Sequence, residues 1–150
     1  MTRVTPPLPT RLLLAAASVL LTACASARAP EFLGTTVGPP RPFSPAVRAN
    51  GFIYLAGQVG TDSTGAIVTG GIQAETRQVM RNIGDVLQRT GSSFDRVVKC
   101  TAFLADMREW NAMNEVYVTF FPAGHYPARS AMGVNGLALG ARVEIECIAV

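Results

Sequence analysis

The sequence predicts an α+β domain in which two helices pack on one face of a mixed β-sheet. Two observations lead to this class. Apolar residues follow the helical period in residues 71–90 and 106–121, and they form short runs of strand character in residues 46–56, 97–104 and 143–150. In chain order the elements read β-β-α-β-α-β-β, which places both helices on the same side of the sheet.

The predicted strands at 52–55, 97–104 and 143–150 are apolar on both faces, whereas the two helices cover only one face of the sheet. The uncovered face must be buried by something. In a chain of 150 residues, further copies of the same chain are the economical solution. The sequence therefore predicts a closed homo-oligomer.

Composition limits the partners of this domain. The chain has 49% apolar and 15% charged residues, enough for a single packed core. Its formal charge is +3, but Arg3 and Arg11 lie in a segment that we expect to be removed. Without them, 11 basic residues face 10 acidic ones, and the net charge is about +1. We therefore expect no nucleic-acid partner.

Residues 1–23 have the features of a signal peptide. Arg3 and Arg11 precede the apolar run 12–21, which is short for a membrane span. The run ends in Leu-Thr-Ala-Cys at residues 21–24, which resembles a bacterial lipobox with Cys24 as the lipidation site. An ordinary secretory signal with an incidental Cys24 is the alternative. We expect a lipid-anchored protein of the bacterial periplasm or cell envelope, on the outer membrane in a Gram-negative cell, that contacts the membrane only through its N-terminal lipid.

Residues 24–35 are expected to form a lipidated tether, because Ala, Ser, Pro and Gly dominate there, and residues 36–150 to form the domain. Near its start, Asn50-Gly51 separates two apolar runs and predicts a hairpin, because both residues tolerate positive φ. Gly57 directly follows the second run. It either allows a ligand or another chain to approach the backbone closely, or simply ends the strand.

The first helix is predicted over residues 71–90. Its apolar stripe faces the sheet, while its charged residues, Glu75 among them, are assigned to a solvated face. The second helix begins at Asp106, which has capping-box spacing to Glu109. One stripe of that helix holds the large side chains and also Asn114. The residues of the two stripes are Ile72, Thr76, Val79, Ile83, Val86 and Leu87 in the first helix, and Trp110, Met113, Tyr117, Phe120 and Phe121 in the second.

The C-terminal stretch carries the clearest chemistry. Two strands joined by a glycine-rich bend place Arg129 and Glu144 on one sheet, within reach of each other. An arginine grips a carboxylate through a planar fork of donors, and a nearby carboxylate holds or activates a water. Glu146 faces the same way as Glu144 and is either a secondary candidate or an oligomer salt bridge. Arg129 as a structural ion-pair partner of these glutamates is the alternative.

Several motifs now carry a family resemblance. Pro127-Ala128-Arg129-Ser130 followed by Val143-Glu144-Ile145 resembles the signature of the RidA/YjgF family, and Tyr54 to Gln58 and Asn111 to Phe121 match other landmarks in order. The resemblance covers about residues 36–150. It implies a fold like Bacillus-type chorismate mutase, homotrimers with interface active sites, and hydrolysis of enamine and imine acids such as 2-aminoacrylate or 2-iminobutyrate to 2-oxo acids and ammonia. No metal or organic cofactor is implied.

The resemblance also implies residue roles. Arg129 matches the arginine that binds the substrate carboxylate, and Glu144 matches the glutamate that positions the attacking water. Asn114 and Gly57 match cleft residues, and the backbone of residue Ala131 is available to the substrate.

Three positions depart from the family pattern. Ala46, Ala56 and Ala131 stand where the family has a tyrosine, a serine and a cysteine. These changes remove hydroxyls and a thiol from the expected pocket. A broader or different substrate range is expected, with hydrolysis retained or lost.

Other chemistries have little support. The one histidine, His125, lies in a predicted loop, which argues against a histidine metal site or a serine triad. Cys100 and Cys147 fall on apolar strand positions and are predicted to be buried thiols, with a disulfide as the alternative in an oxidising compartment.

Two other functions stay open beside the hydrolase. A module that binds small carboxylates or acts like a chaperone, without turnover, is favoured by the missing polar groups. Endoribonuclease activity, attributed to some relatives, fits poorly with one lysine and a near-neutral domain.

Overall fold

The computed structural model describes residues 28–33 and 42–150. The expected signal peptide at 1–23, Cys24 and the expected domain start at residue 36 lie outside the described residues. None of the helices in the described ranges is long and apolar enough to cross a membrane.

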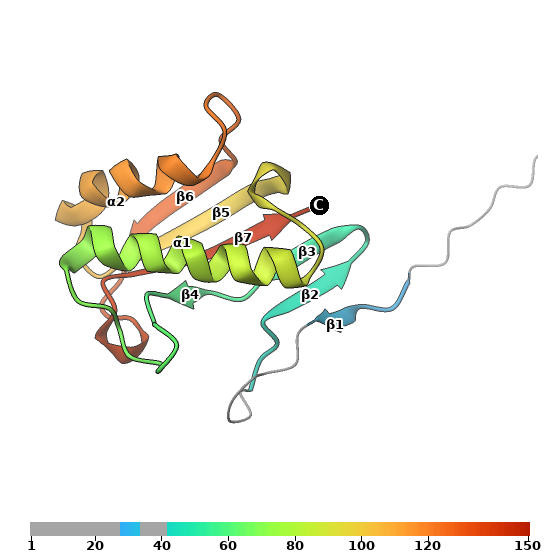
Figure 1. The fold of residues 1–150 in the computed structure, drawn as a ribbon, viewed down its shortest axis with the longest axis horizontal. Helices are drawn as coiled ribbons and strands as arrows, with labels where there is room; N and C mark the ends of the chain where they lie inside the picture. Colours follow the sequence, from blue (N-terminus) through green and yellow to red (C-terminus); the bar gives the residue numbers. More distant parts are fainter. Residues whose placement is uncertain (1–27, 34–41) are drawn as a thin grey trace, which may run out of the picture.

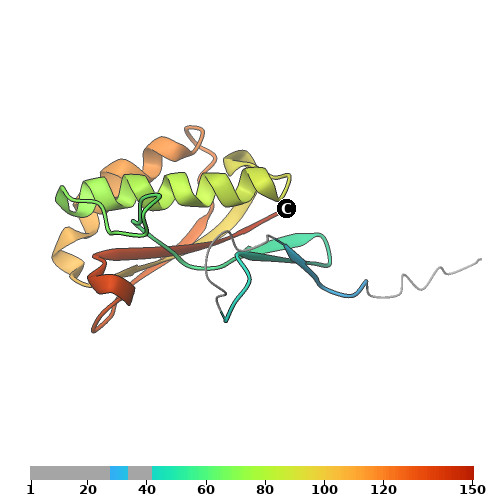
Figure 2. The same cartoon turned by 60° about the horizontal axis from the view of Figure 1, so that its bottom comes forward.

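A single mixed sheet of seven strands forms the domain, and helices α1 and α2 cover one of its faces (Figures 1 and 2). The strand order is β1-β2-β3-β7-β5-β6, with β4 also pairing with β7. The predicted class and the predicted order of elements are confirmed, with β1 and β4 added. The helices are α1 Gly71–Arg89 and α2 Trp110–Tyr117; the strands are β1 Glu31–Leu33, β2 Ala46–Ala49, β3 Phe52–Leu55, β4 Gln58–Val59, β5 Val97–Leu104, β6 Ala128–Gly133 and β7 Val143–Ala149; and short 3-10 turns span Phe94–Arg96, Met107–Glu109, Val118–Phe120 and Ala138–Gly140.

Part of the expected tether is a strand. β1 pairs antiparallel with β2, and Arg48 of β2 donates to Glu31 of β1 at 3.0 Å. The composition of the segment concealed this pairing, because a three-residue edge strand leaves almost no periodic pattern.

The predicted hairpin is confirmed. β2 and β3 pair antiparallel across Asn50 and Gly51, whose φ angles are 50° and 83°. Such angles are accessible to asparagine and glycine with little strain, so the turn chemistry sets the register of this hairpin. Ala46 and Leu55 face each other in that register, and both are buried in the core.

The apolar stripe of α1 forms the centre of the core, as predicted. Val79, Ile83 and Leu87 are fully buried against the sheet. The assignment of Glu75 to a solvated face is wrong, because Glu75 is only 4% exposed and its carboxylate accepts the backbone N–H of Arg142. Helical periodicity missed it, because its partner is 67 residues away in sequence.

Asp106, where the sequence predicted the second helix to begin, starts the 3-10 turn Met107–Glu109, and its side chain accepts the N–H of Arg108. The helix α2 itself begins at Trp110. Hydrogen bonding to the Arg108 side chain lowers the pKa of Asp106 to about 2, so this cap is charged at working pH. Glu109 does not close a capping box. Its carboxylate instead binds the guanidinium of Arg142.

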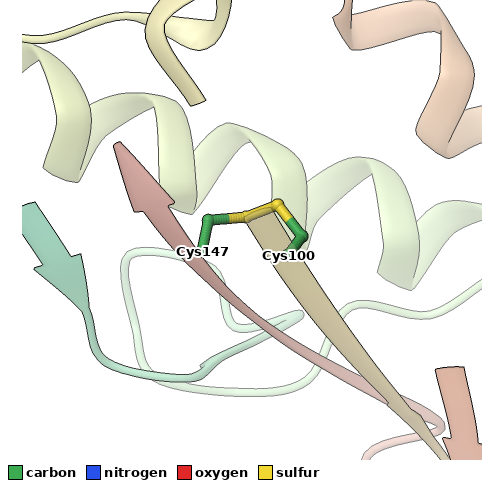
Figure 3. Close-up of a disulfide and its surroundings, with 2 residues drawn as sticks. All are labelled: Cys100 and Cys147. Carbon is green, nitrogen blue, oxygen red and sulfur yellow. A yellow bond between two sulfur atoms is a disulfide. The ribbon is translucent and has the colours of Figure 1, made fainter. Parts of the chain in front are cut away.

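β5 and β7 are joined by a disulfide between Cys100 and Cys147 (Figure 3). The prediction of two buried free thiols is therefore wrong, although both residues are buried as expected. The two cysteines are direct partners in the β5–β7 register, with their Cα atoms 4.1 Å apart. Apolar patterning cannot reveal this alignment, because it depends on which strands become neighbours.

Large apolar side chains remain exposed on the sheet. The exposed fraction is 40% for Phe52, 45% for Tyr54 and 44% for Met132. Tyr54 is paired with a half-buried apolar residue of β7, and Met132 with one of β5. Such a surface is unusual for a monomer and is typical of an interaction site.

The disulfide gives a stability prediction. Reducing Cys100–Cys147 in the folded protein should lower the free energy of unfolding by about 2–4 kcal/mol, because the bond constrains a long loop in the unfolded chain. Denaturant unfolding with and without a phosphine reductant measures this difference. The double variant Cys100→Ala/Cys147→Ala is the control and should not respond to reductant. Equal stability of the oxidised and reduced wild type would contradict the prediction.

Candidate active site

Arg129 lies on the helix-covered face of the sheet. β6 runs parallel to β5, and their register places Arg129 beside Cys100, whose side chain is buried under the helices. The Arg129 guanidinium carbon lies 4.6 Å from the ring centroid of Tyr117 and 5.9 Å from that of Trp110. Both aromatic residues belong to α2. Contacts of this kind are each worth about 0.5–2 kcal/mol and hold the flat guanidinium group between the helix and the sheet.

No carboxylate in the described ranges pairs with Arg129. The alternative in which Arg129 serves as an ion-pair partner of Glu144 or Glu146 is therefore not realised within one chain. Aromatic rings hold the guanidinium through its face and leave its N–H donors available to an external acceptor.

Two polar atoms on the same helix also lack partners. The Oδ1 of Asn114 and the hydroxyl of Tyr117 are buried and make no hydrogen bond within the described structure. Burial raises the pKa of Tyr117 to about 12, although the charge of Arg129 acts in the opposite direction, so the phenol stays neutral. A buried polar atom without a hydrogen-bond partner costs free energy, so each such atom in a folded protein calls for an explanation.

Glu144 lies in a separate corner, against Gly57. A β-carbon built on Gly57 would lie 2.0 Å from Oε1 of Glu144, so only glycine leaves room for this carboxylate. The contact arises because β4 pairs with β7 and aligns Val59 with Glu144. Gly57 thus permits a close approach, and the group that lies against it in the described chain is its own Glu144. Approach by a ligand or another chain stays a prediction.

The prediction that Arg129 and Glu144 are within reach of each other is wrong for a single chain. They share a sheet, but β5 lies between β6 and β7. Arg129 is aligned with Cys100 of β5, and Cys100 is aligned with Cys147 of β7, so these three side chains face the helices. Glu144 lies three residues before Cys147 along β7. Successive strand residues point to opposite faces, so the arginine and the glutamate face opposite sides of the sheet. A single chain therefore does not bring Arg129 and Glu144 together.

The remaining expected residues divide between the surroundings of Arg129, the surroundings of Glu144 and the core. Ala131 packs against the core from the same face of β6 as Arg129. Ala56 is half-buried next to Gly57. Ala46 is 1% exposed within the core, so its position does not line an open pocket, contrary to expectation.

Glu146 is exposed on the same face of β7 as Glu144. It aligns with Thr101 and forms no ion pair within the described chain.

Trp110 and Tyr117 contact Arg129 directly, but the sequence indicated them only as core residues. The available signal was their spacing, because both lie on the stripe of α2 that carries Asn114. No group of three or more His, Cys, Asp or Glu side chains in residues 28–33 and 42–150 is placed to hold a metal ion.

The sequence is similar to an extensive family. A family model described as endoribonuclease L-PSP matches residues 35–150. A mouse protein named 2-iminobutanoate/2-iminopropanoate deaminase is 42% identical over 134 residues, covering 89% of this chain and 93% of the mouse protein. The chloroplastic Reactive Intermediate Deaminase A of Arabidopsis thaliana is 38% identical over 135 residues, covering 89% of this chain and 68% of that protein.

Solved structures share the fold. YyfA of Yersinia pestis, described as a member of the conserved Rid protein family, has a TM-score of 0.76 at 36% identity, covering 81% of this chain and 98% of that one. The TdcF protein of E. coli, crystallised with bound serine, has a TM-score of 0.72 at 29% identity, covering 80% of this chain and 98% of that one.

The contact between Gly57 and Glu144 gives a second prediction. Gly57→Ala should leave the domain folded, with a loss of about 1–3 kcal/mol, but should displace the Glu144 carboxylate. A crystal structure of the variant checks the displacement. Gly136→Ala is the matched control, because a β-carbon at Gly136 meets nothing within 4 Å. An unmoved Glu144 in Gly57→Ala would contradict the prediction.

Proposed function

The chain belongs to the endoribonuclease L-PSP family, also called RidA/YjgF, and on this premise we propose that it is a cofactor-free hydrolytic deaminase of small enamine and imine acids. Its fold is that family's chorismate-mutase-like fold, and the similar curated proteins are named deaminases that act on C=N bonds. The observation that carries the proposal is Arg129, held by Tyr117 and Trp110 and paired with no carboxylate of the described chain.

The proposed substrates are small enamine and imine acids of the 2-aminoacrylate or 2-iminobutyrate type, which yield 2-oxo acids and ammonia. An enamine first becomes the imine, as its methylene carbon gains a proton and its nitrogen loses one. Two relatives support this class of substrate. The mouse relative is named for 2-iminobutanoate and 2-iminopropanoate, and the E. coli relative was crystallised with serine, a small amino acid that carries a carboxylate.

The chemistry requires little of the protein. Arg129 binds the substrate carboxylate through two charge-assisted hydrogen bonds and so fixes the imine carbon in space. Glu144 holds a water and accepts its proton as the water oxygen bonds to that carbon. The C=N electron pair moves to nitrogen, which takes up a proton. The carbinolamine then forms its C=O bond and releases ammonia, so no nucleophilic side chain is needed.

Asn114, Gly57 and the backbone of Ala131 complete the proposed site. The unpartnered Oδ1 of Asn114 is suited to accept an N–H of the imine or ammonia. Gly57 leaves space beside Glu144, and Ala131 follows Arg129 on the same face of β6.

The complete site is proposed to form between copies of the chain in a homotrimer. Arg129 and Glu144 face opposite sides of one sheet, so an intact site needs Arg129 from one copy and Glu144 from a neighbour. The exposed apolar side chains, including Phe52 and Tyr54, support burial of this surface by a neighbouring copy. Glu146 is then available for an ion pair between copies.

The envelope location and the lipid on Cys24 also remain proposals. The Cys100–Cys147 disulfide supports an oxidising compartment, because such bonds are uncommon in reducing cytosol. Mass spectrometry of the mature N-terminus tests the lipid, and an unmodified Cys24 would contradict it.

A second candidate is a module that binds small carboxylates without turnover. Ala56 and Ala131 favour it, because neither offers a side-chain hydrogen bond to a reacting substrate. An endoribonuclease has less support, since the chain contains one lysine.

Substitution of the two proposed catalytic residues separates these candidates. With imines generated by an amino-acid oxidase, Arg129→Ala should raise KM about 10- to 100-fold, because charge-assisted hydrogen bonds to the carboxylate are lost. Glu144→Gln should lower kcat about 100-fold or more, because the proton acceptor is lost. Ammonia release measures both. Arg81→Ala, on the exposed side of α1, is the control. Binding of pyruvate by a wild type that accelerates no imine hydrolysis would favour the binding module.

Mixed oligomers test the shared site. Arg129→Ala and Glu144→Gln chains, unfolded together and refolded, should regain activity in roughly a quarter of their sites, because some interfaces pair an intact arginine with an intact glutamate. Each variant refolded alone is the control. Activity of the mixture no higher than the mean of the two variants would place the site within one chain.

A further inference from the structure

The buried carboxylate of Glu75 has no role in the chemistry described so far. Glu75 lies in the second turn of α1 and is 4% exposed. Its Oε2 accepts the backbone N–H of Arg142 at 2.8 Å, and its Oε1 lies 3.7 Å from Nε of the same arginine. Burying a carboxylate costs free energy unless hydrogen bonds or an ion pair compensate. The contacts of Glu75 with Arg142 therefore hold this arginine in place.

Arg142 is held at three points. Besides the bond to Glu75, its carbonyl accepts the N–H of Ala105, just after β5, at 2.9 Å. Its guanidinium donates to Oε1 of Glu109, just before α2, at 2.5 Å. Arg142 thus connects α1, the end of β5 and the start of α2 at a single residue.

Both parts of the Glu144 corner depend on this connection. Arg142 immediately precedes β7, and Glu144 is the second residue of that strand. The segment from Gly57 to Gly60 forms the other side of the corner and packs on Glu75, because a β-carbon on Gly60 would lie 3.0 Å from the Glu75 Cα. Glu75 therefore contacts the segment that flanks Glu144 and fixes the residue that leads into its strand.

We propose that Glu75 and Arg142 are positioning residues that set the place of the Glu144 carboxylate. This inference rests on the proposed function, in which Glu144 holds the attacking water. In this role Glu75 acts through the backbone of Arg142, whose N–H its carboxylate accepts, while its own backbone packs against Gly60. Because small displacements of a catalytic group reduce rates strongly, the effect falls on the chemical step and not on carboxylate binding at Arg129.

The test compares two substitutions of one residue. Glu75→Ala removes the acceptor for the Arg142 N–H and should lower kcat for imine hydrolysis at least about tenfold, with KM within about twofold of wild type. Glu75→Gln keeps an acceptor oxygen and should retain kcat within about threefold. Glu115→Ala is the matched control, because Glu115 also links the two helices, accepting from Gln73 at 2.7 Å, but lies on the exposed side.

Hydrogen exchange gives a readout that needs no activity. In Glu75→Ala, the amide of Arg142 should exchange at least about tenfold faster than in Glu115→Ala, because its acceptor is lost. Where Glu75→Ala does not fold, Arg142→Gln replaces it. That variant keeps the backbone N–H, loses the guanidinium bond to Glu109, and should lower kcat at least about threefold with KM unchanged.

The outcomes separate the two proposals. Faster exchange in a protein whose wild type hydrolyses no imine would support the positioning network and reject the proposed function. Full kcat in Glu75→Ala, or a rise in KM alone, would overturn the positioning role while leaving the proposed function intact. Equal losses of kcat in Glu75→Ala and Glu115→Ala would also overturn it.

Discussion

The alternation of side chains along β7 is the constraint on which the rest of the structure depends. β7 is bonded to β3, β4 and β5, so its register is set from both sides. Val143, Ile145 and Cys147 enter the core, and Glu144 must then point to the other face. One register thus produces the core of the sheet, the disulfide partner of Cys100 and the position of the proposed catalytic carboxylate.

The same alternation explains why one chain does not bring Arg129 and Glu144 together. β6 is aligned to β5 so that Arg129 shares the face of the buried cysteines, under α2. Glu144 points to the opposite face of the sheet and lies against Gly57. No side-chain rotation moves a residue through a hydrogen-bonded sheet. The proposed site, which uses both residues, therefore needs a second copy of the chain, and the exposed apolar side chains offer a surface for it.

The buried polar groups of the structure differ in whether they have hydrogen-bond partners. Glu75 is buried but satisfied by Arg142, so its charge fixes the backbone of the chain. The Oδ1 of Asn114 and the hydroxyl of Tyr117 are buried without a hydrogen bond, although the ring of Tyr117 packs in the core and against Arg129. These two polar atoms therefore add no hydrogen bond to the stability of the described chain.

The sequence by itself determined the elements that depend on local chemistry. Asn50-Gly51 set the hairpin, the stripe through Val79 and Ile83 set α1, and the motifs around Arg129 and Glu144 indicated the family. Tertiary structure alone decided the rest: the insertion of β5 between β6 and β7, the Cys100–Cys147 bond and the burial of Glu75. The physical reason is the distance along the sequence over which each effect acts. Periodicity and turn preferences act over a few residues, whereas strand order and register join residues 47 and 67 positions apart, and no local pattern records which distant strands become neighbours.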